Sequence, residues 1–310
     1  MRAASYDRYG GPEVLTVGEV PEPPVGPDTV LVRAKATSVN PVDWKVREGY
    51  LQERYPHHLP VIPGWDVAGV VEKVGPAVVT GVQEGDEVWG YVRRDDIAHG
   101  TAAELVPAPE RTVSRKPAGM SFEEAACVPL VGLTAWQALT EAMRVSEGER
   151  VLVHAASGGV GQMAVQVAAA LGAEVIGTAS PVNHNLVRSL GATTVFDHGA
   201  GPVSEQLADH GGPVDAVLDL IGGDALADAP AQVGDPARVI SIIDPQTVIG
   251  MGGRYVFVRP DRGHLDALAA LVDDGRLRVT VARTFDLDDL AEAHRLSGEG
   301  HPGGKIAVRV

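Results

Sequence analysis

The chain has one cysteine, few aromatic residues and a deficit of positive charge. Its single thiol, Cys127, excludes an internal disulfide and any zinc site built on several thiolates. With 26 Lys and Arg against 41 Asp and Glu, the formal net charge is −15, which disfavours binding to nucleic acids and anionic membranes. No run approaches the roughly 18 apolar residues of a transmembrane helix, and the N-terminus shows no signal-like apolar segment. We therefore expect a cytoplasmic protein with no nucleic-acid or membrane partner.

What the chain does contain is enough apolar sequence for sizeable cores. Hydrophobic residues make up 45% of its 310 residues, a length that suggests about two domains. The 37 glycines and 22 prolines are spread along the sequence, which is typical of turns rather than of low-complexity segments.

The first third of the sequence shows the patterns of short strands. Val30–Thr37 alternates with a period of two, which predicts a half-buried strand with Thr37 on its polar face. Val67–Val74 and Glu87–Val92 show similar patterns, separated by Gly/Pro turns. Many short strands of this kind predict an antiparallel, barrel-like domain.

Strand and helix patterns alternate after Ser121. Ser121 and Glu124 form a capping-box pattern that predicts a helix at Phe122–Ala126. Further strands are expected at Arg150–His154, Glu174–Thr178, Thr194–Phe196, Ala216–Leu220, Arg238–Ile243, Tyr255–Val258 and Lys305–Val310, and helices at Val160–Leu171, Pro181–Leu190 and His264–Asp273. The alternation predicts a parallel sheet with helices on both faces.

The most informative motif is VLVHAASGGVG at Val151–Gly161, a strand that leads through a glycine-rich turn into a helix. Small residues let the backbone approach a pyrophosphate, and the helix N-terminus supplies N–H donors and a positive dipole end. The alternative is a purely structural turn. The context favours dinucleotide binding, with contacts from Ser157, Gly158, Gly159 and Val160.

The residues after the second strand of this domain bear on which dinucleotide binds. An NAD site usually places Asp or Glu about 20 residues after the glycines, to hold the ribose 2′-OH. No acid occurs between Glu174 and Asp197, while Ser180 and Asn183 can hydrogen-bond a phosphate at that position. We therefore predict NADPH as the cofactor and keep NADH as the alternative.

Several stretches together resemble the zinc-free branch of the medium-chain dehydrogenase/reductase superfamily, which contains quinone oxidoreductases of the zeta-crystallin type and enone (oxoene) reductases. They are SVNPVDWKVREG (Ser38–Gly49), PVIPGWDVAGVVEKVG (Pro60–Gly75), GDEVWGYV (Gly85–Val92), PLVGLTAWQAL (Pro129–Leu139), the glycine motif and the C-terminal GGKIAVRV. The resemblance implies an α/β protein with a GroES-like, β-barrel-type catalytic domain at residues 1–122 and 260–310. Residues 123–259 are then a Rossmann domain with a doubly wound parallel sheet.

The resemblance also indicates a site without a metal. Asn40 lies where the zinc branch has its first Cys ligand, and Gly64-Trp65-Asp66 stands in place of a Gly-His-Glu motif. Trp65 and Tyr50 are assigned to the substrate pocket. Without a Lewis acid, the substrate must be electrophilic by itself, as quinones and α,β-unsaturated carbonyls are.

Three residues in the segment Asn40–Lys45 are the catalytic candidates. Asn40 either donates to the substrate or holds the local turn, and Asp43 either orients Lys45 or caps a helix. Lys45 hydrogen-bonds either the cofactor ribose or the substrate oxygen.

The resemblance implies further cofactor contacts and a homodimer. Thr134 is expected beside the nicotinamide, with an ordinary helix-interior threonine as the alternative. Phe257 and Val258 are expected to close over the ring, and Lys305 approaches the cofactor unless it is an exposed surface lysine. Ile221 is also assigned to the cofactor site, and the irregular stretch Ile243–Gly253 is expected to be a loop facing it. The edge strand Tyr255–Val258 is expected to pair two copies of the chain.

The sequence thus predicts an NADPH-dependent oxidoreductase that transfers hydride to a small quinone or enone substrate. Two alternatives stay open. One is an enoyl-thioester reductase of polyketide or fatty-acid type, for which Arg93-Arg94 would begin a basic track. The other is a non-catalytic protein that binds NADPH.

Overall fold

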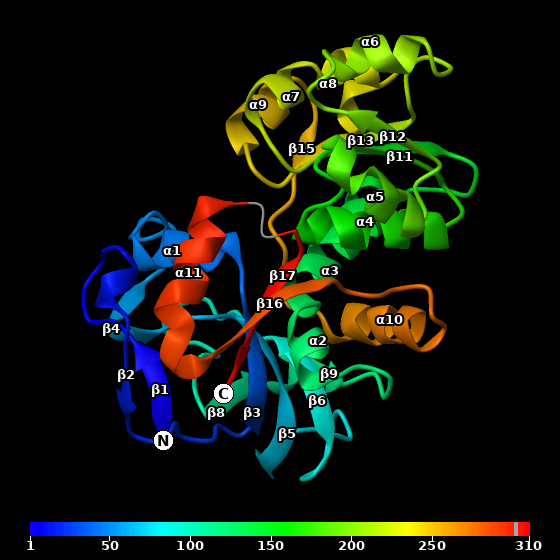
Figure 1. The fold of residues 1–310 in the computed structure, drawn as a ribbon. Helices are drawn as coiled ribbons and strands as arrows, with labels where there is room; N and C mark the ends of the chain where they lie inside the picture. Colours follow the sequence, from blue (N-terminus) through cyan, green and yellow to red (C-terminus); the bar gives the residue numbers. More distant parts are fainter. Residues whose placement is uncertain (301–302) are drawn as a thin grey trace. The chain divides into compact units, whose positions relative to one another are not determined.

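The computed structural model describes residues 1–300 and 303–310, and the chain divides into two compact units. The first unit comprises Met1–Leu130, Arg259–Asp273 and Val279–Val310, and the second comprises Val131–Val258 and Asp274–Arg278. Both ends of the chain therefore lie in the first unit (Figure 1). The domain bounds expected from the sequence differ from these, because they assign residues 123–130 and 259 to the second unit and 274–278 to the first.

A seven-stranded sheet forms the framework of the first unit. Its strands run in the order β16 (Val281–Asp286), β17 (Lys305–Arg309), β3 (Thr29–Val39), β5 (Asp66–Val74), β6 (Glu87–Tyr91) and β9 (Val113–Arg115), and β8 (Leu105–Pro109) also pairs with β3. Apart from the parallel pair β16–β17, neighbouring strands are antiparallel. Two small sheets join β1 (Arg2–Ser5) to β2 (Thr16–Glu19) and β4 (His57–Ile62) to β7 (Ile97–His99). The expected GroES-like domain is confirmed.

Strand β3 shows how far the alternating pattern predicts burial. The apolar face is buried and Arg33 and Lys35 are exposed, as the period of two predicts. The expectation that Thr37 faces solvent is wrong, because Thr37 is only 1% exposed. Its hydroxyl lies 2.8 Å from Thr101 Oγ1 and donates to the carbonyl of Asp66 at 2.7 Å. These partners let a polar side chain lie inside the unit, since a buried hydroxyl is tolerated when it is hydrogen-bonded.

The helices of the first unit are α1 (Pro41–Arg47), α2 (Phe122–Ala126), α10 (Arg262–Asp273) and α11 (Leu290–Glu299). The predicted capping box of α2 is confirmed. Ser121 Oγ accepts from the backbone N–H of Glu124 at 3.2 Å, and Glu124 Oε2 accepts from the N–H of Ser121 at 2.9 Å. Short 3₁₀ turns lie at Pro12–Val14, Glu110–Thr112 and Leu287–Asp289.

The second unit is built on a six-stranded sheet in which every neighbouring pair is parallel. The order is β12 (Thr194–Asp197), β11 (Glu174–Ala179), β10 (Arg150–Val153), β13 (Ala216–Asp219), β14 (Val239–Ser241) and β15 (Arg254–Tyr255). This confirms the expected Rossmann-type doubly wound sheet. Its topological switch point lies between β10 and β13, where ligands bind such sheets beyond the carboxyl ends of the strands.

Short helices connect these strands. They are α4 (Gly159–Ala170), α5 (His184–Ser189), α6 (Val203–Ala208), α7 (Gly223–Ala227), α8 (Ala229–Gln232) and α9 (Pro245–Gly250). The helix α3 (Pro129–Gln137) continues as a π-helix at Ala138–Met143, and 3₁₀ turns lie at Pro181–Asn183 and Pro236–Arg238. Within the described part of the chain, no helix has the length and apolar character needed to cross a membrane.

Two expectations for the last part of this unit are wrong. The stretch 243–253 is not wholly irregular, because it contains α9: the Asp244 side chain accepts from the N–H of Thr247 at 3.0 Å, and Pro245 stands in the first turn. An acidic N-cap followed by proline is a helix-start signal. The last strand is shorter than Tyr255–Val258, since β15 ends at Tyr255.

Candidate functional site

A buried polar network joins α1, β5 and β17 in the first unit. Asp66, with no exposed surface, accepts hydrogen bonds of 2.8 Å from Ser38 Oγ, Asn40 Nδ2 and the backbone N–H of Leu130. On its other side, the Asn40 amide oxygen accepts from Lys305 Nζ. The amide of Asn40 is therefore held between a carboxylate and an ammonium group.

The network contains two carboxylates and one ammonium group, and all three are buried. Burial raises the pKa of Asp66, although Lys305 and the hydrogen bonds from Asn40 and Ser38 oppose the rise. Burial raises the pKa of Asp43 to about 7, against a backbone hydrogen bond of 2.7 Å from Asn40. The carboxyl of Asp43 can therefore gain or lose a proton near neutral pH.

The structure brings two of the predicted catalytic residues together with one predicted cofactor residue and places Lys45 elsewhere. Asn40, Asp43 and Lys305 meet in the network, where Asp43 caps the start of α1 through the N–H of Asn40. Lys305 is 6% exposed, so it is not a surface lysine. Lys45 Nζ instead lies 5.5 Å from the centre of the Trp44 ring.

The two predicted pocket residues, Trp65 and Tyr50, differ in their surroundings. Trp65 is 7% exposed, packs edge-on against Tyr91, and lines a small cleft of the first unit together with Asp43. Tyr50 is 67% exposed and lies edge-on to Trp44.

The glycine-rich turn in the second unit has the shape that its sequence predicts. Gly158 is the N-cap of α4, so the helix begins at the expected turn. A Cβ at Gly161 would lie 2.2 Å from the carbonyl oxygen of Ala155, so only glycine lets helix and turn approach this closely. Ala155 itself has a φ of 46°, and its N–H donates to Thr178 Oγ1 at 3.1 Å.

Beside this turn, Asn183 lies within hydrogen-bonding distance of two other predicted cofactor residues. Asn183 Nδ2 is 3.1 Å from Ser180 Oγ and 3.4 Å from Ser157 Oγ. Ser180 follows β11 and Asn183 ends the next 3₁₀ turn, so the cluster joins the glycine turn to the end of the second strand. The hydrogen-bond donors of this cluster are neutral hydroxyl and amide groups, which can donate to a phosphate on the ribose.

The other predicted cofactor residues of the second unit include buried and exposed side chains. Thr134 is buried on α3 and Val258 is also buried, whereas Phe257 is 37% exposed and Ile221 is 47% exposed. The structure leaves the cofactor contacts of these side chains as predictions.

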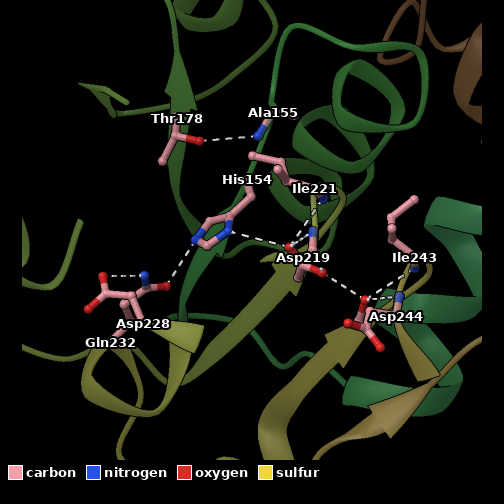
Figure 2. Close-up of polar contacts among 11 residues, drawn as sticks. His154, Ala155, Thr178, Asp219, Ile221, Asp228, Gln232, Ile243 and Asp244 are labelled. Atoms are coloured by element: carbon pink, nitrogen blue, oxygen red, sulfur yellow. Dashed lines mark hydrogen bonds and ion pairs between the residues drawn. The ribbon is translucent and has the colours of Figure 1, made fainter. Parts of the chain in front are cut away.

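Beyond the switch point, a second buried network surrounds Asp219 at the end of β13 (Figure 2). Its carboxylate accepts from the backbone N–H groups of Ile221 and Gly222 and, at 2.7 Å, from Ser241 Oγ. Burial by itself raises the pKa of Asp219, but His154, Ser241 and the two N–H groups outweigh it and keep that pKa below its usual value. Asp219 is therefore a buried carboxylate that stays ionised at neutral pH.

Asp66 and Asp219 are central to the two networks but were not among the residues expected at the site. Each is a lone acid beside apolar residues, in GWDVAGVV and in AVLDLIGG. A buried charge requires partners, so an acid in an apolar strand is a usable signal. Its partners are distant in sequence, and the pattern does not name them.

Metal-ligating groups do not cluster in the part of the chain that the structure covers: no three His, Cys, Asp or Glu side chains lie together in a way that could hold an ion. The lone thiol is buried, and its burial raises the pKa of Cys127 to about 12.

Comparison with known proteins gives two family matches. Residues 26–118 match the model of the alcohol dehydrogenase GroES-like domain, and residues 190–308 match a model described as zinc-binding dehydrogenase.

Individual relatives cover nearly the whole chain. Human NAD(P)H oxidoreductase RTN4IP1, mitochondrial, is 33% identical over 100% of this chain and 89% of the relative. The tomato (Solanum lycopersicum) 2-methylene-furan-3-one reductase is 32% identical over 99% of this chain and 79% of its own length. The structure of the quinone oxidoreductase from Coxiella burnetii superimposes with a TM-score of 0.89 at 33% identity, over 100% of this chain and 99% of that one.

Proposed function

Because the chain belongs to the medium-chain dehydrogenase/reductase family and its relatives include quinone oxidoreductases and an enone reductase, we propose that it catalyses hydride transfer from NADPH to a small quinone or α,β-unsaturated carbonyl. Membership of this family supports an oxidoreductase that uses a nicotinamide cofactor. The choice of NADPH and the class of substrate are the proposal.

The observation that carries the proposal is the cluster of Ser157, Ser180 and Asn183 beside the glycine turn. A carboxylate at this point would bind a ribose 2′-OH and repel a 2′-phosphate. Neutral hydroxyl and amide groups can instead donate hydrogen bonds to the phosphate, which supports NADPH over NADH.

When bound, the reduced nicotinamide supplies a hydride, which the β-carbon of an enone or a quinone carbon accepts while a proton from solvent completes the reduction. Negative charge then builds on the substrate oxygen, and hydrogen-bond donors stabilise it. Asn40 and Lys305 are the proposed source of this polar environment, with Lys45 as a further donor. The Asn40 amide hydrogens already face Asp66 and Ser38, which supports a positioning role for Asn40 and leaves the positive charge with Lys305.

We propose that this chemistry proceeds without zinc. At the positions that correspond to zinc ligands, Asn40 has its amide engaged by Asp66 and Lys305, and Trp65 carries an indole, which is not a metal ligand. A conjugated substrate does not need the Lewis acid, because its own carbonyl withdraws electrons from the β-carbon.

The test is anaerobic oxidation of NADPH followed optically, with an alkyl vinyl ketone and an ortho-quinone as acceptors and NADH as the control. Turnover of either acceptor with NADPH supports the proposal, and turnover of the enone favours hydride transfer to carbon. Binding of NADPH without turnover of either acceptor would overturn it, leaving a thioester substrate or a non-catalytic role. A metal chelator should leave the rate unchanged.

We also propose a homodimer in the cytoplasm. In the described part of the second unit, β15 is the end strand of the sheet, and the edge of a sheet can pair with a second copy. Light scattering on the purified chain, and on a Tyr255→Lys variant that adds charge to this edge, tests the dimer. A monomeric wild type would contradict it.

A further inference from the structure

Two loops follow the strands on one side of the switch point in the second unit. The first continues from β13 at residues 220–222, and the second continues from β14 at residues 242–244. Each loop carries an isoleucine with nearly half of its surface exposed, 47% for Ile221 and 45% for Ile243. Large apolar side chains exposed at the carboxyl edge of a parallel sheet lie where such sheets bind their ligands.

One buried carboxylate holds both loops. Asp219 accepts from the N–H groups of Ile221 at 3.1 Å and Gly222 at 3.0 Å, which fixes the first loop. Ser241 Oγ donates to Asp219 at 2.7 Å and accepts from the N–H groups of Ile243 at 3.1 Å and Asp244 at 3.2 Å, which fixes the second. Figure 2 shows this chain of contacts running from one loop to the other through Asp219.

A buried histidine lies beside this carboxylate inside the unit. His154 Nδ1 lies 3.7 Å from Asp219 Oδ1, and His154 Nε2 lies 2.9 Å from Gln232 Oε1. Gln232 Nε2 donates to Asp228 at 2.8 Å, so its oxygen faces the imidazole and the Nε2 of His154 carries the hydrogen. His154, which precedes the glycine turn, is thus held through its Nε2 by Gln232, while its Nδ1 lies beside Asp219 without a hydrogen bond to it.

We propose that Asp219 is a positioning residue of the cofactor site, and that it keeps Ile221 and Ile243 at fixed places beside the bound dinucleotide through Ser241 and the backbone N–H groups of both loops. The inference rests on the proposed function, because it requires the cofactor to bind in the second unit. Ile221 and the stretch that begins at Ile243 are already expected at the cofactor site, and the inference adds Asp219 and Ser241 as the residues that position them.

The geometry requires a carboxylate at this position. Both Asp219 oxygens accept hydrogen bonds, from N–H groups on one side and from the Ser241 hydroxyl on the other. An asparagine would turn an NH₂ group toward one of these donors. The Ser241 oxygen already accepts from the N–H groups of Ile243 and Asp244, which use both of its lone pairs. To accept a hydrogen bond from the asparagine NH₂ group it would have to release one of them, so the second loop would lose an anchor.

The test compares NADPH binding by the full-length wild type with binding by Asp219→Asn and Ser241→Ala. The dissociation constant is measured by NADPH fluorescence, and KM and kcat are measured with the acceptor that turns over best. We expect each variant to raise the dissociation constant and the KM for NADPH about tenfold, while the KM for the acceptor stays unchanged. Because Ser241 acts on the second loop through the same chain of hydrogen bonds as Asp219, the double variant should lose little more than Asp219→Asn alone.

A merely structural role would give a different result. It would lower the melting temperature and the fraction of chains that bind, but the folded fraction would keep the wild-type dissociation constant. Asp209→Asn, which removes an exposed carboxylate at the end of α6, is the matched control and should bind NADPH as the wild type does. Ile221→Ser tests the loop directly and should also weaken binding, even if Asp219→Asn fails to fold.

The outcomes separate this inference from the proposed function. If the wild type binds neither NADPH nor NADH, the proposed function fails and the inference fails with it. If the wild type binds NADPH while folded Ser241→Ala and Ile221→Ser bind it equally well, the inference is overturned and the proposed function stands.

Discussion

At the scale of single residues, the buried carboxylates divide into two kinds. Asp219 receives enough hydrogen bonds to hold its pKa below the usual range, despite its burial. Asp43 receives fewer, and burial raises its pKa to about 7. Donors act against burial and neighbouring charge and do not decide the pKa by number alone, because Asp66 accepts three hydrogen bonds and burial still raises its pKa.

The raised pKa of Asp43 predicts a stability that falls as pH rises. Between pH 4 and 7 the unfolded chain loses this proton before the folded chain does, which favours unfolding. Asp43→Asn removes the titration while its amide oxygen can still accept from the N–H of Asn40. Denaturant unfolding at pH 5 and pH 8 should show that the wild type loses stability relative to the variant by up to about 3 kcal/mol. Asp95→Asn, at a carboxyl that is 96% exposed, is the control, and parallel pH slopes for all three proteins would refute this expectation.

A single charge at Ser180 should change the choice of cofactor. In Ser180→Asp, a carboxylate replaces the hydroxyl that lies 3.1 Å from Asn183 Nδ2, where the ribose 2′-phosphate is proposed to bind. We expect the KM for NADPH to rise by about tenfold to a hundredfold, because like charges repel, while the KM for NADH falls or stays constant. Steady-state kinetics with both cofactors measures the ratio. Ser146→Asp adds the same charge at an exposed position of the same unit, and an equal effect there would show that the charge acts non-specifically.

At the scale of elements, close packing of α4 on the glycine turn positions the N-terminus of the helix. Gly161 makes this approach possible, because any Cβ there would meet the carbonyl oxygen of Ala155 at 2.2 Å. The G-x-x-G spacing thus has a steric reason besides access for a phosphate.

Gly161→Ala should accordingly cost stability as well as cofactor binding. The clash is with backbone, which cannot rotate away, so we expect a loss of about 1–3 kcal/mol and weaker NADPH binding. Thermal unfolding and fluorescence titration measure the two effects. Gly250→Ala is the control in the same unit, since a Cβ there would contact nothing within 4 Å. Equal melting temperatures for the two variants would show that the turn can relax.

At the scale of the whole molecule, the two units depend on the chain in different ways. The second unit is formed almost entirely by one continuous segment, whereas the first is built from both ends of the chain. Strand β17 lies between β16 and β3, so the last residues occupy the interior of the main sheet of the first unit.

Removal of residues 304–310 should therefore unfold the first unit and spare the second. The truncation deletes β17 and the Lys305 side chain that contacts Asn40. Three of the four tryptophans, Trp44, Trp65 and Trp89, lie in the first unit, so native tryptophan fluorescence should be largely lost. NADPH binding by the second unit should persist. Deletion of Val310 alone is the control, and native fluorescence in the longer truncation would contradict the prediction.

Local patterns in the sequence were sufficient wherever a structure depends on neighbouring residues. The capping box of Ser121 and Glu124, the strand alternation around Arg33 and the spacing of Gly158 and Gly161 all involve contacts within a few residues. Such contacts recur as readable patterns, because short-range geometry repeats with the period of the helix or strand. The family resemblance extended this reading to the two-unit architecture.

The tertiary structure alone decided which groups meet at the sites. Lys305 rather than Lys45 meets the Asn40 amide, although Lys305 is 265 residues away in sequence. Asp66 reaches Asn40 across paired strands, and Asp219 reaches Ser241 across the ends of neighbouring strands. The sequence by itself determined where strand residues alternate and where the glycine-rich turn leads into α4, because both depend on neighbouring residues. The partner of each buried charge was decided by folding, because strand order and register bring together residues that share no local pattern.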